Sequence, residues 1–121
     1  MLKKIKEYDQ NIIAALKKLK LPLHTFDGHE VYFDINVCGE DVYHHISDKK
    51  HHLHVVDINA IPFILKDKKS IRNDRNGKKY RTYIGRRGKT KEKTKYIKIV
   101  TLLHKNKKES IYTIYLIKNM N

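Results

Sequence analysis

Hydrophobic positions near the start of the chain recur at helical spacing. Apolar residues three or four positions apart, with Lys and Glu between them, form one face of an amphipathic helix. The residues on this face are Leu2, Ile5, Ile12, Ile13, Leu16 and Leu19. Leu21-Pro22 ends the pattern, because the residue before a proline is pushed out of the helical region. The pattern predicts a helix over residues 2–20, within an amphipathic segment 1–21.

Three further segments precede the strand-rich second half. Residues 30–37 are β-branched and aromatic, which predicts a strand. Residues 57–65 carry apolar residues on one helical face, with Asp57 as the expected N-cap and Pro62 in the first turns, where its missing N–H is tolerated best. The histidine-rich stretch 41–54 between them is compatible with a short helix, a loop or a partly extended segment.

The second half alternates between apolar and polar residues. Residues 80–86, 96–103 and 111–117 each show the two-residue period of a strand, and residues 73–77 have the composition of a turn. Lys98 lies between two isoleucines in the middle of the second of these strands, so its face of the sheet is not expected to be wholly buried.

Alternation along the last strand places Thr113 and Tyr115 on one face and Tyr112, Ile114 and Leu116 on the other. The order of elements is helix, strand, short helix and antiparallel meander. We therefore expect an α+β fold with an N-terminal helix, a short second helix and an antiparallel sheet of about four strands, with the helices packed on one face.

Charge is concentrated in one part of the chain, which we treat as a single domain, residues 1–121. Residues 64–108 hold 18 Lys and Arg against three acids, whereas the remaining residues are almost neutral, so this segment supplies the net charge of +14. Such a segment attracts polyanions, and nucleic acid is the commonest of these in a cytoplasm. The single cysteine, Cys38, and the lack of a signal peptide or long apolar run favour a cytoplasmic protein that is not inserted in a membrane.

Histidines cluster just before the basic segment. Five of the eight lie between residues 44 and 54, and Lys49 and Lys50 are their neighbours. Histidine exchanges protons near neutral pH, and lysine binds phosphate. Cleavage of RNA without a metal needs these parts: a base for the 2′-OH, cations for the phosphorane and an acid for the leaving oxygen. A zinc site on His52 and His54 is the alternative, but no nearby Cys or acidic ligand set completes it, so no metal or other cofactor is expected.

The layout resembles the barnase–EndoU–colicin D–RelE class of ribonucleases, especially its small phage-borne members. The resemblance covers residues 45–117 and rests on order and spacing. It is carried by Lys49-Lys50-His51-His52, the short helix with Pro62, the strands 80–84 and 96–100, and Thr113-Ile114-Tyr115. In colicin D-like members a Lys/His cluster and a hydroxyl-x-aromatic pair on the terminal strand form the site. The resemblance implies an active face on the last strands and no metal.

The expected site follows from these residues. His51 or His52 would be the base, with Lys98 and Thr113 as the other catalytic residues, and one imidazole of the Lys49–His54 run should face Thr113 across the sheet. The expected RNA-binding residues are Lys50, His54, Arg72, Arg86, Arg87 and Tyr115.

Three functions are compatible with these features. The first is a toxin-like endoribonuclease that leaves a 2′,3′-cyclic phosphate on RNA, with tRNA among the candidate substrates and an acidic antitoxin or immunity protein as partner. The second is a non-catalytic nucleic-acid-binding protein that uses the same lysines and tyrosines. The third is a phage-encoded inhibitor that binds a host protein.

Overall fold

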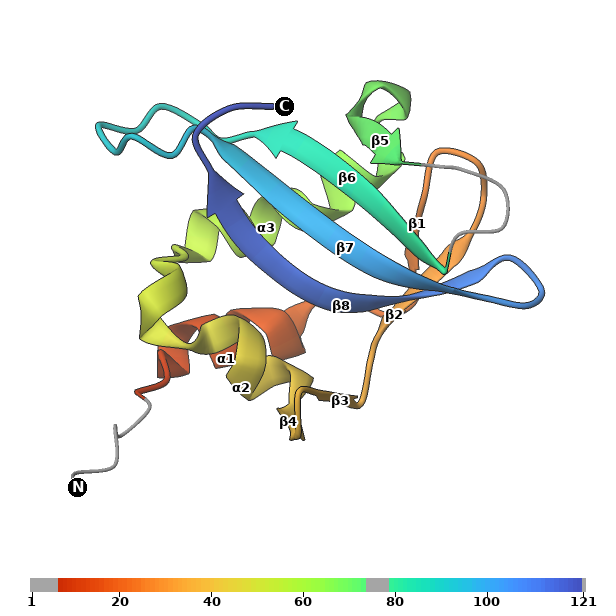
Figure 1. Cartoon of the computed structure of the whole chain (residues 1–121), viewed down its shortest axis with the longest axis horizontal. Helices are drawn as coiled ribbons and strands as arrows, with labels where there is room; N and C mark the ends of the chain where they lie inside the picture. Colours follow the sequence, from red (N-terminus) through yellow and green to blue (C-terminus); the bar gives the residue numbers. More distant parts are fainter. Residues whose placement is uncertain (1–6, 74–78, 121) are drawn as a thin grey trace.

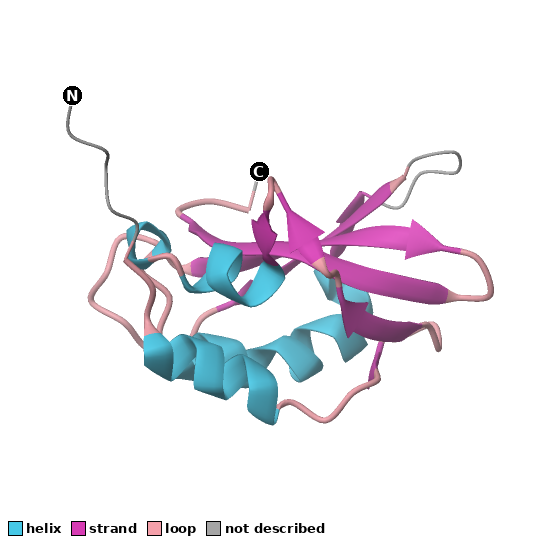
Figure 2. Cartoon of the chain, turned by 90° about the horizontal axis from the view of Figure 1, so that it is seen from below, coloured by secondary structure: helices cyan, strands magenta, loops and turns pink. Residues whose placement is uncertain are grey.

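A curled six-stranded sheet with helices against one face makes up most of the molecule (Figures 1 and 2). The computed structural model describes residues 7–73 and 79–120. Within them the helices are α1 (Gln10–Lys18), α2 (Val42–Ser47) and α3 (Val55–Lys66), with short 3₁₀ turns at Lys49–His51 and Lys68–Ser70. The strands are β1 (Leu23–His24), β2 (Glu30–Phe33), β3 (Asn36–Val37), β4 (Glu40–Asp41), β5 (Ile71–Asn73), β6 (Tyr80–Arg86), β7 (Tyr96–His104) and β8 (Lys108–Ile117).

The sheet is larger than the sequence predicts and is mixed rather than antiparallel. Its order is β1-β2-β8-β7-β6-β5, and β3 and β4 form a separate two-stranded ribbon. The β6-β7-β8 meander is antiparallel as expected, whereas β2 pairs with β8 in parallel. The additional strands are short or pair with partners that are distant in the sequence. The alternation of apolar and polar residues reports local structure, so it does not reveal such pairing. The α+β class with helices on one face is confirmed.

Two predicted elements differ in extent from the structure. The strand expected at 30–37 is divided, because the Asp34 side chain accepts a hydrogen bond from the Ile35 backbone N–H (2.8 Å) and the chain turns into β3. The helix expected over residues 2–20 begins at Gln10, because Asp9 adopts an extended backbone and its carboxylate caps the first turn. Residues 1–6, and positions 74–77 of the predicted turn, lie outside the described residues.

The helix predicted at residues 57–65 also differs from the structure, because it begins earlier than predicted. α3 starts at Val55, and His54 is the residue before it. Asp57 is therefore inside the first turn, where its carboxylate accepts a hydrogen bond from the His54 backbone N–H (2.9 Å). The histidine-rich stretch contains α2, which Asp41 caps, followed by the 3₁₀ turn.

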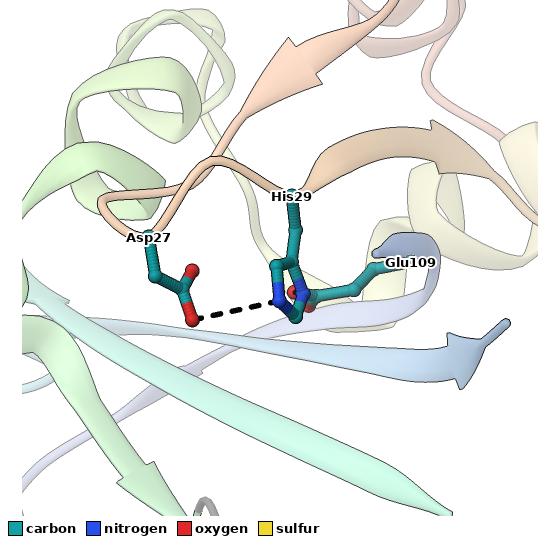
Figure 3. Close-up of side chains that lie close together, drawn as sticks. All are labelled: Asp27, His29 and Glu109. Atoms are coloured by element: carbon teal, nitrogen blue, oxygen red, sulfur yellow. Dashed lines mark hydrogen bonds and ion pairs between the residues drawn. The ribbon is translucent and has the colours of Figure 1, made fainter. Parts of the chain in front are cut away.

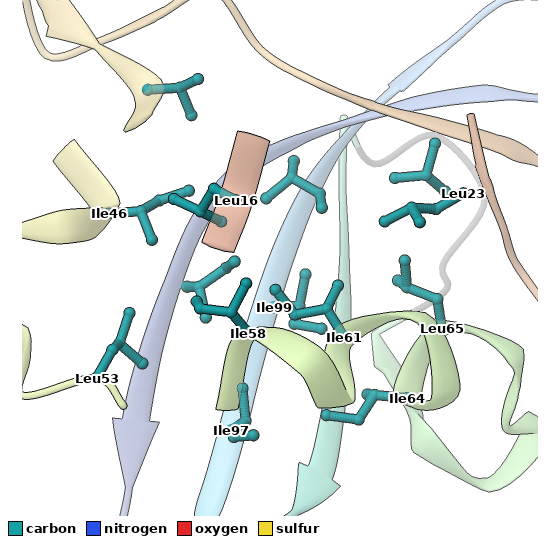
Figure 4. Packing of buried hydrophobic residues seen from close by; sticks show 14 of the residues in the cluster. Leu16, Leu23, Ile46, Leu53, Ile58, Ile61, Ile64, Leu65, Ile97 and Ile99 are labelled. Atoms are coloured by element: carbon teal, nitrogen blue, oxygen red, sulfur yellow. The ribbon is translucent and has the colours of Figure 1, made fainter. Parts of the chain in front are cut away.

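The hydrophobic core lies between the helices and the sheet. Buried isoleucines of α3, among them Ile58 and Ile61, face Ile97 and Ile99 of β7 (Figure 4). Each such side chain contributes about 1.5–3 kcal/mol relative to an exposed position. Because alternate residues of a strand point to opposite faces, Lys98 lies on the face that the helices leave uncovered.

A register shift in β8 determines which side chains lie on this uncovered face. Thr101 pairs with Ile111, but Val100 pairs with Thr113, so Tyr112 is an extra residue in the strand. The shift places Thr113 on the face of Val100 and Lys98. Tyr112, at this extra position, packs edge-on against Tyr80, with ring centroids 5.6 Å apart, and also packs against the buried core cluster that contains Ile114. We call the uncovered surface around Lys98, Val100, Thr113 and Tyr115 the open face.

No helix within residues 7–73 and 79–120 combines the length and apolar character that are needed to cross a bilayer.

Candidate functional site

The candidate site lies where α2 meets the edge of β8 (Figure 1). β2 pairs with β8 only as far as Ile111, so the last part of β8 has no neighbouring strand on that side among the described residues. α2 and the 3₁₀ turn after it lie beside this part of the edge. Their histidines therefore meet the groups that β8 contributes to the open face.

His45 of α2 connects this edge to two other polar groups. Its Nε2 lies 3.2 Å from Thr113 Oγ1, and its Nδ1 lies 3.3 Å from Glu40 Oε1. The second oxygen of Glu40 accepts a hydrogen bond from the Tyr8 hydroxyl (2.9 Å). A carboxylate can only accept, so Nδ1 carries a hydrogen and Nε2 is the nitrogen directed at Thr113. His45 belongs to the histidine-rich stretch of the sequence, but the sequence pattern predicts no catalytic or RNA-binding role for it.

His51 is the second imidazole at the edge. Its Nδ1 lies 3.3 Å from the backbone carbonyl oxygen of Ile114, so this nitrogen is the donor and Nε2 keeps its lone pair. Burial lowers the pKa of His51 below its ordinary value, although the hydrogen bond to Ile114 acts in the opposite direction. The rings of His45 and His51 meet edge to face, with centroids 5.6 Å apart. The pair therefore combines a neutral imidazole with one that faces a carboxylate.

Lys98 and Tyr115 complete the candidate site on the open face. They are direct partners across β7 and β8, and the Lys98 ammonium lies 5.4 Å from the centroid of the Tyr115 ring. Val100 and Thr113 form the next directly opposed pair on this face. An ammonium, an aromatic ring and a hydroxyl thus follow one another across two strands, as the alternation pattern predicted for these positions.

A pocket adjoins the site beside His51. It has a volume of about 480 Å³ and is lined by Lys50, His51, His52, Glu92, Lys93, Thr94, Tyr115 and Leu116. Its walls combine aromatic and aliphatic surface with two lysines. Such a lining suits a flat, partly apolar group attached to an anion, and a nucleotide has this character.

The prediction that an imidazole of the Lys49–His54 run faces Thr113 was wrong. Within the described part of the chain, the ring that contacts Thr113 belongs to His45. His51 bonds the neighbouring backbone instead, and His52 is exposed with a left-handed backbone at the end of the 3₁₀ turn. His54 is exposed as well, and its ring is 3.1 Å from a Glu92 carboxylate oxygen.

The other cationic residues that were expected to bind RNA lie in different surroundings. Lys50 is largely exposed beside the pocket, with Asp48 3.7 Å away, and Arg86 is exposed at the end of β6. Arg72 is exposed on β5 and donates to the backbone carbonyls of Lys69 and Ile71. Arg72 on β5 and Arg86 on β6 are therefore separate from the histidines, whereas Lys50 lines the pocket together with His51 and His52.

Arg87 was expected to contact RNA, but of the expected RNA-binding residues its surroundings fit that role least. Its side chain is only 3% exposed, and its guanidinium binds both oxygens of buried Asp57 at 2.8 and 3.0 Å. It also forms an ion pair with Glu92 at 2.9 Å. These partners raise the pKa of Arg87 despite its burial. Its guanidinium joins α3 to the loop after β6, so we do not include it in the candidate site.

A second polar cluster, at the opposite end of the sheet, has ligand types that suit a metal. Asp27, His29 and Glu109 bring three ligand atoms within 4.8 Å of one another (Figure 3). The guanidinium of Arg81 already lies among them, with Nη1 2.8 Å from Glu109 and Nη2 2.7 Å from Asp27. A metal ion there would face a buried positive charge. The cluster is therefore better described as an ion-pair network.

Comparison with known proteins adds no functional assignment. No protein-family model matches the chain, and no curated protein and no solved structure matches it. Two imidazoles and a hydroxyl at the edge of β8, with an ammonium on the neighbouring strand β7, are suited to moving protons beside a bound anion.

Proposed function

We propose that the protein is a metal-independent endoribonuclease whose active site is the His45–His51 pair at the edge of β8. The observation that carries this proposal is the different surroundings of the two rings. His51 is half-buried and bonded to a backbone carbonyl, whereas His45 lies between a carboxylate and a hydroxyl. A pair of titratable groups with such contrasting environments suits one base and one acid.

The proposed reaction is an internal displacement at phosphorus. Nε2 of His51 accepts the proton of the 2′-OH, and the 2′-oxygen forms a bond to the adjacent phosphorus. The bond from phosphorus to the 5′-oxygen breaks, and protonated His45 donates the Nε2 hydrogen to that oxygen. The products are a 2′,3′-cyclic phosphate and a free 5′-hydroxyl. Because the nucleophile belongs to the substrate, RNA is cut and DNA is not.

The open face would bind and stabilise the substrate. The Lys98 ammonium offsets the charge that gathers on the phosphorane oxygens, and the Thr113 hydroxyl orients the phosphate. The Tyr115 ring and the pocket beside His51 would hold a nucleobase by stacking. The exposed cations of the basic segment supply the general attraction for RNA, and this attraction weakens as salt is added.

Cleavage of a cellular RNA pool that contains tRNA, in the presence of EDTA, tests the proposal. We expect 2′,3′-cyclic phosphate ends from the wild type and a loss of rate of about 10²–10⁴-fold in His51→Ala and in His45→Ala. His24→Ala is the matched control, because His24 is exposed on β1, away from the site. A wild type that produces no cyclic phosphate from any RNA, or a His51→Ala that cuts at the wild-type rate, would refute it.

A non-catalytic RNA-binding protein is the second candidate, and the aromatic residues on the sheet favour it. Tyr80 and Tyr112 pack against each other, and Lys98 lies over Tyr115. Interleaved tyrosines and lysines bind single strands with little sequence preference. Binding that weakens steeply with salt, without cleavage, would support this function instead.

The proposed ribonuclease would be toxin-like and would require a neutralising partner in its host. A net charge of +14 is complementary to an acidic antitoxin or immunity protein. Such a partner should inhibit cleavage and bind less tightly as salt is added.

A further inference from the structure

A chain of polar contacts extends from His45 away from the open face. The Tyr8 hydroxyl donates to one oxygen of Glu40, the other oxygen faces Nδ1 of His45, and Nε2 of His45 faces Thr113. The distances are 2.9, 3.3 and 3.2 Å. The side chains of Glu40 and His45 are only 18% and 21% exposed, so water has limited access to their contact.

Three segments that are distant in the sequence build this chain: residues 7–9, residues 40–45 and β8. The backbone of residues 7–9 lies against residues 47–49, with hydrogen bonds from Asp9 N to Ser47 O (2.8 Å) and from Lys49 N to Glu7 O (2.9 Å). This contact places Tyr8 beside α2, where its ring also meets the His44 ring at 4.8 Å.

Glu40 is placed by the ribbon that precedes α2. Cys38 and Gly39 both have positive φ (52° and 82°), the conformation of a two-residue hairpin turn between β3 and β4. Glu40 follows this turn, and Asp41 then caps α2 through the backbone N–H groups of Tyr43 and His44. The carboxylate of Glu40 and the ring of His45 therefore belong to one locally fixed unit.

We propose that Glu40, held by Tyr8, is a positioning residue that keeps His45 oriented as the proton donor to the leaving oxygen. The carboxylate holds a hydrogen on Nδ1 and turns Nε2 toward Thr113 and the open face. Tyr8 fixes the carboxylate by its second oxygen. This role rests on the proposed ribonuclease function, in which His45 is the acid and His51 is the base.

Two substrates separate this role from a merely structural one. A dinucleoside monophosphate has a leaving 5′-oxygen that needs a proton, whereas a ribonucleoside 3′-(p-nitrophenyl phosphate) has a leaving group that departs without one. We expect Glu40→Ala to lower kcat on the dinucleotide by at least about tenfold, within the range that general acids contribute. Its kcat on the activated ester should change less than about twofold, and KM should be unchanged on both.

Three further variants complete this experiment. Glu40→Gln keeps an oxygen that can accept from Nδ1, so it should recover part of the lost rate. Tyr8→Phe should show the same substrate dependence more weakly, which covers the case in which Glu40→Ala does not fold. Glu30→Gln, a matched change on β2, should alter neither rate. Equal losses on both substrates in Glu40→Ala and Tyr8→Phe would overturn the proposal.

Nitrogen-15 NMR of the His45 ring gives a readout that does not depend on activity. With the ring neutral, the wild type should carry its hydrogen on Nδ1, whereas Glu40→Ala should give a mixture with the Nε2–H form. An unchanged tautomer in Glu40→Ala would overturn the positioning role. A wild type that cuts neither substrate would refute the proposed ribonuclease function instead, and the NMR result would still decide whether Glu40 orients His45.

Discussion

His51 is the residue whose environment is most directly suited to accepting a proton. Its Nδ1 is bonded to the Ile114 carbonyl, and burial lowers the pKa of its ring. A base with a lowered pKa remains neutral at pH 7 and keeps its Nε2 lone pair for the 2′-OH.

The pH dependence of cleavage should reflect the protonation of the His51 ring. The active form of His51 is neutral, so kcat/KM should rise as pH increases through a midpoint below the ordinary histidine value of about 6.5. The midpoint of the acidic limb should match the pKa of His51 measured by NMR titration. An acidic limb centred above the ordinary value would assign the base to another group.

Neighbouring arginines at the end of β6 and in the loop after it have different roles. Arg86 is exposed at the end of β6, whereas Arg87 turns inward and binds Asp57 of α3. Sequence position alone does not separate them, because both belong to one basic run. The difference arises from the direction in which the backbone presents each side chain and from the acid that α3 supplies.

The two arginines form a matched pair of variants. Arg87→Ala leaves the buried carboxylate of Asp57 without its partner and should lower the free energy of unfolding by about 3–5 kcal/mol. Arg86→Ala should change stability by less than about 0.5 kcal/mol and should weaken RNA binding instead. Urea denaturation and RNA titration measure the two effects. If Arg87→Ala were fully stable but bound RNA less tightly, Arg87 would have to be assigned to the RNA-binding surface.

At the scale of the whole molecule, an ion-pair network joins the first and last parts of the chain. Glu109 of β8 is fully buried and accepts from Arg81, Tyr83 and Thr101. Arg81 also pairs with Asp27, which lies between β1 and β2. The network fixes these outer strands to the meander and so supports the β8 edge on which the candidate site depends.

Asp27 makes part of this support dependent on pH. Burial by itself would raise the pKa of Asp27, but hydrogen bonds from Arg81 and Thr25 hold it below the ordinary value. The stabilising charge is therefore present above about pH 4 and is lost as pH falls through the lowered pKa. Asp27→Asn should be less stable than the wild type at pH 7, and the difference should shrink toward pH 3. Denaturation curves across this range, with Glu30→Gln as control, provide the measurement.

The sequence by itself determined the elements of the core and the composition of the open face. Apolar periodicity located α1, α3 and the meander, and alternation put Lys98 on the face that the helices leave uncovered. These features depend on neighbouring residues and on the repeat of a helix or strand, which a sequence records directly.

Only the tertiary structure decided which histidines meet β8 and which charges are buried. The parallel pairing of β2 with β8, the extra residue at Tyr112 and the contact of His45 with Thr113 join positions far apart in the chain. Arg81 and Arg87 belong to the basic segment, but each is buried against an acid that another element supplies. Such contacts depend on long-range packing, and a local pattern of polar and apolar residues carries no record of it.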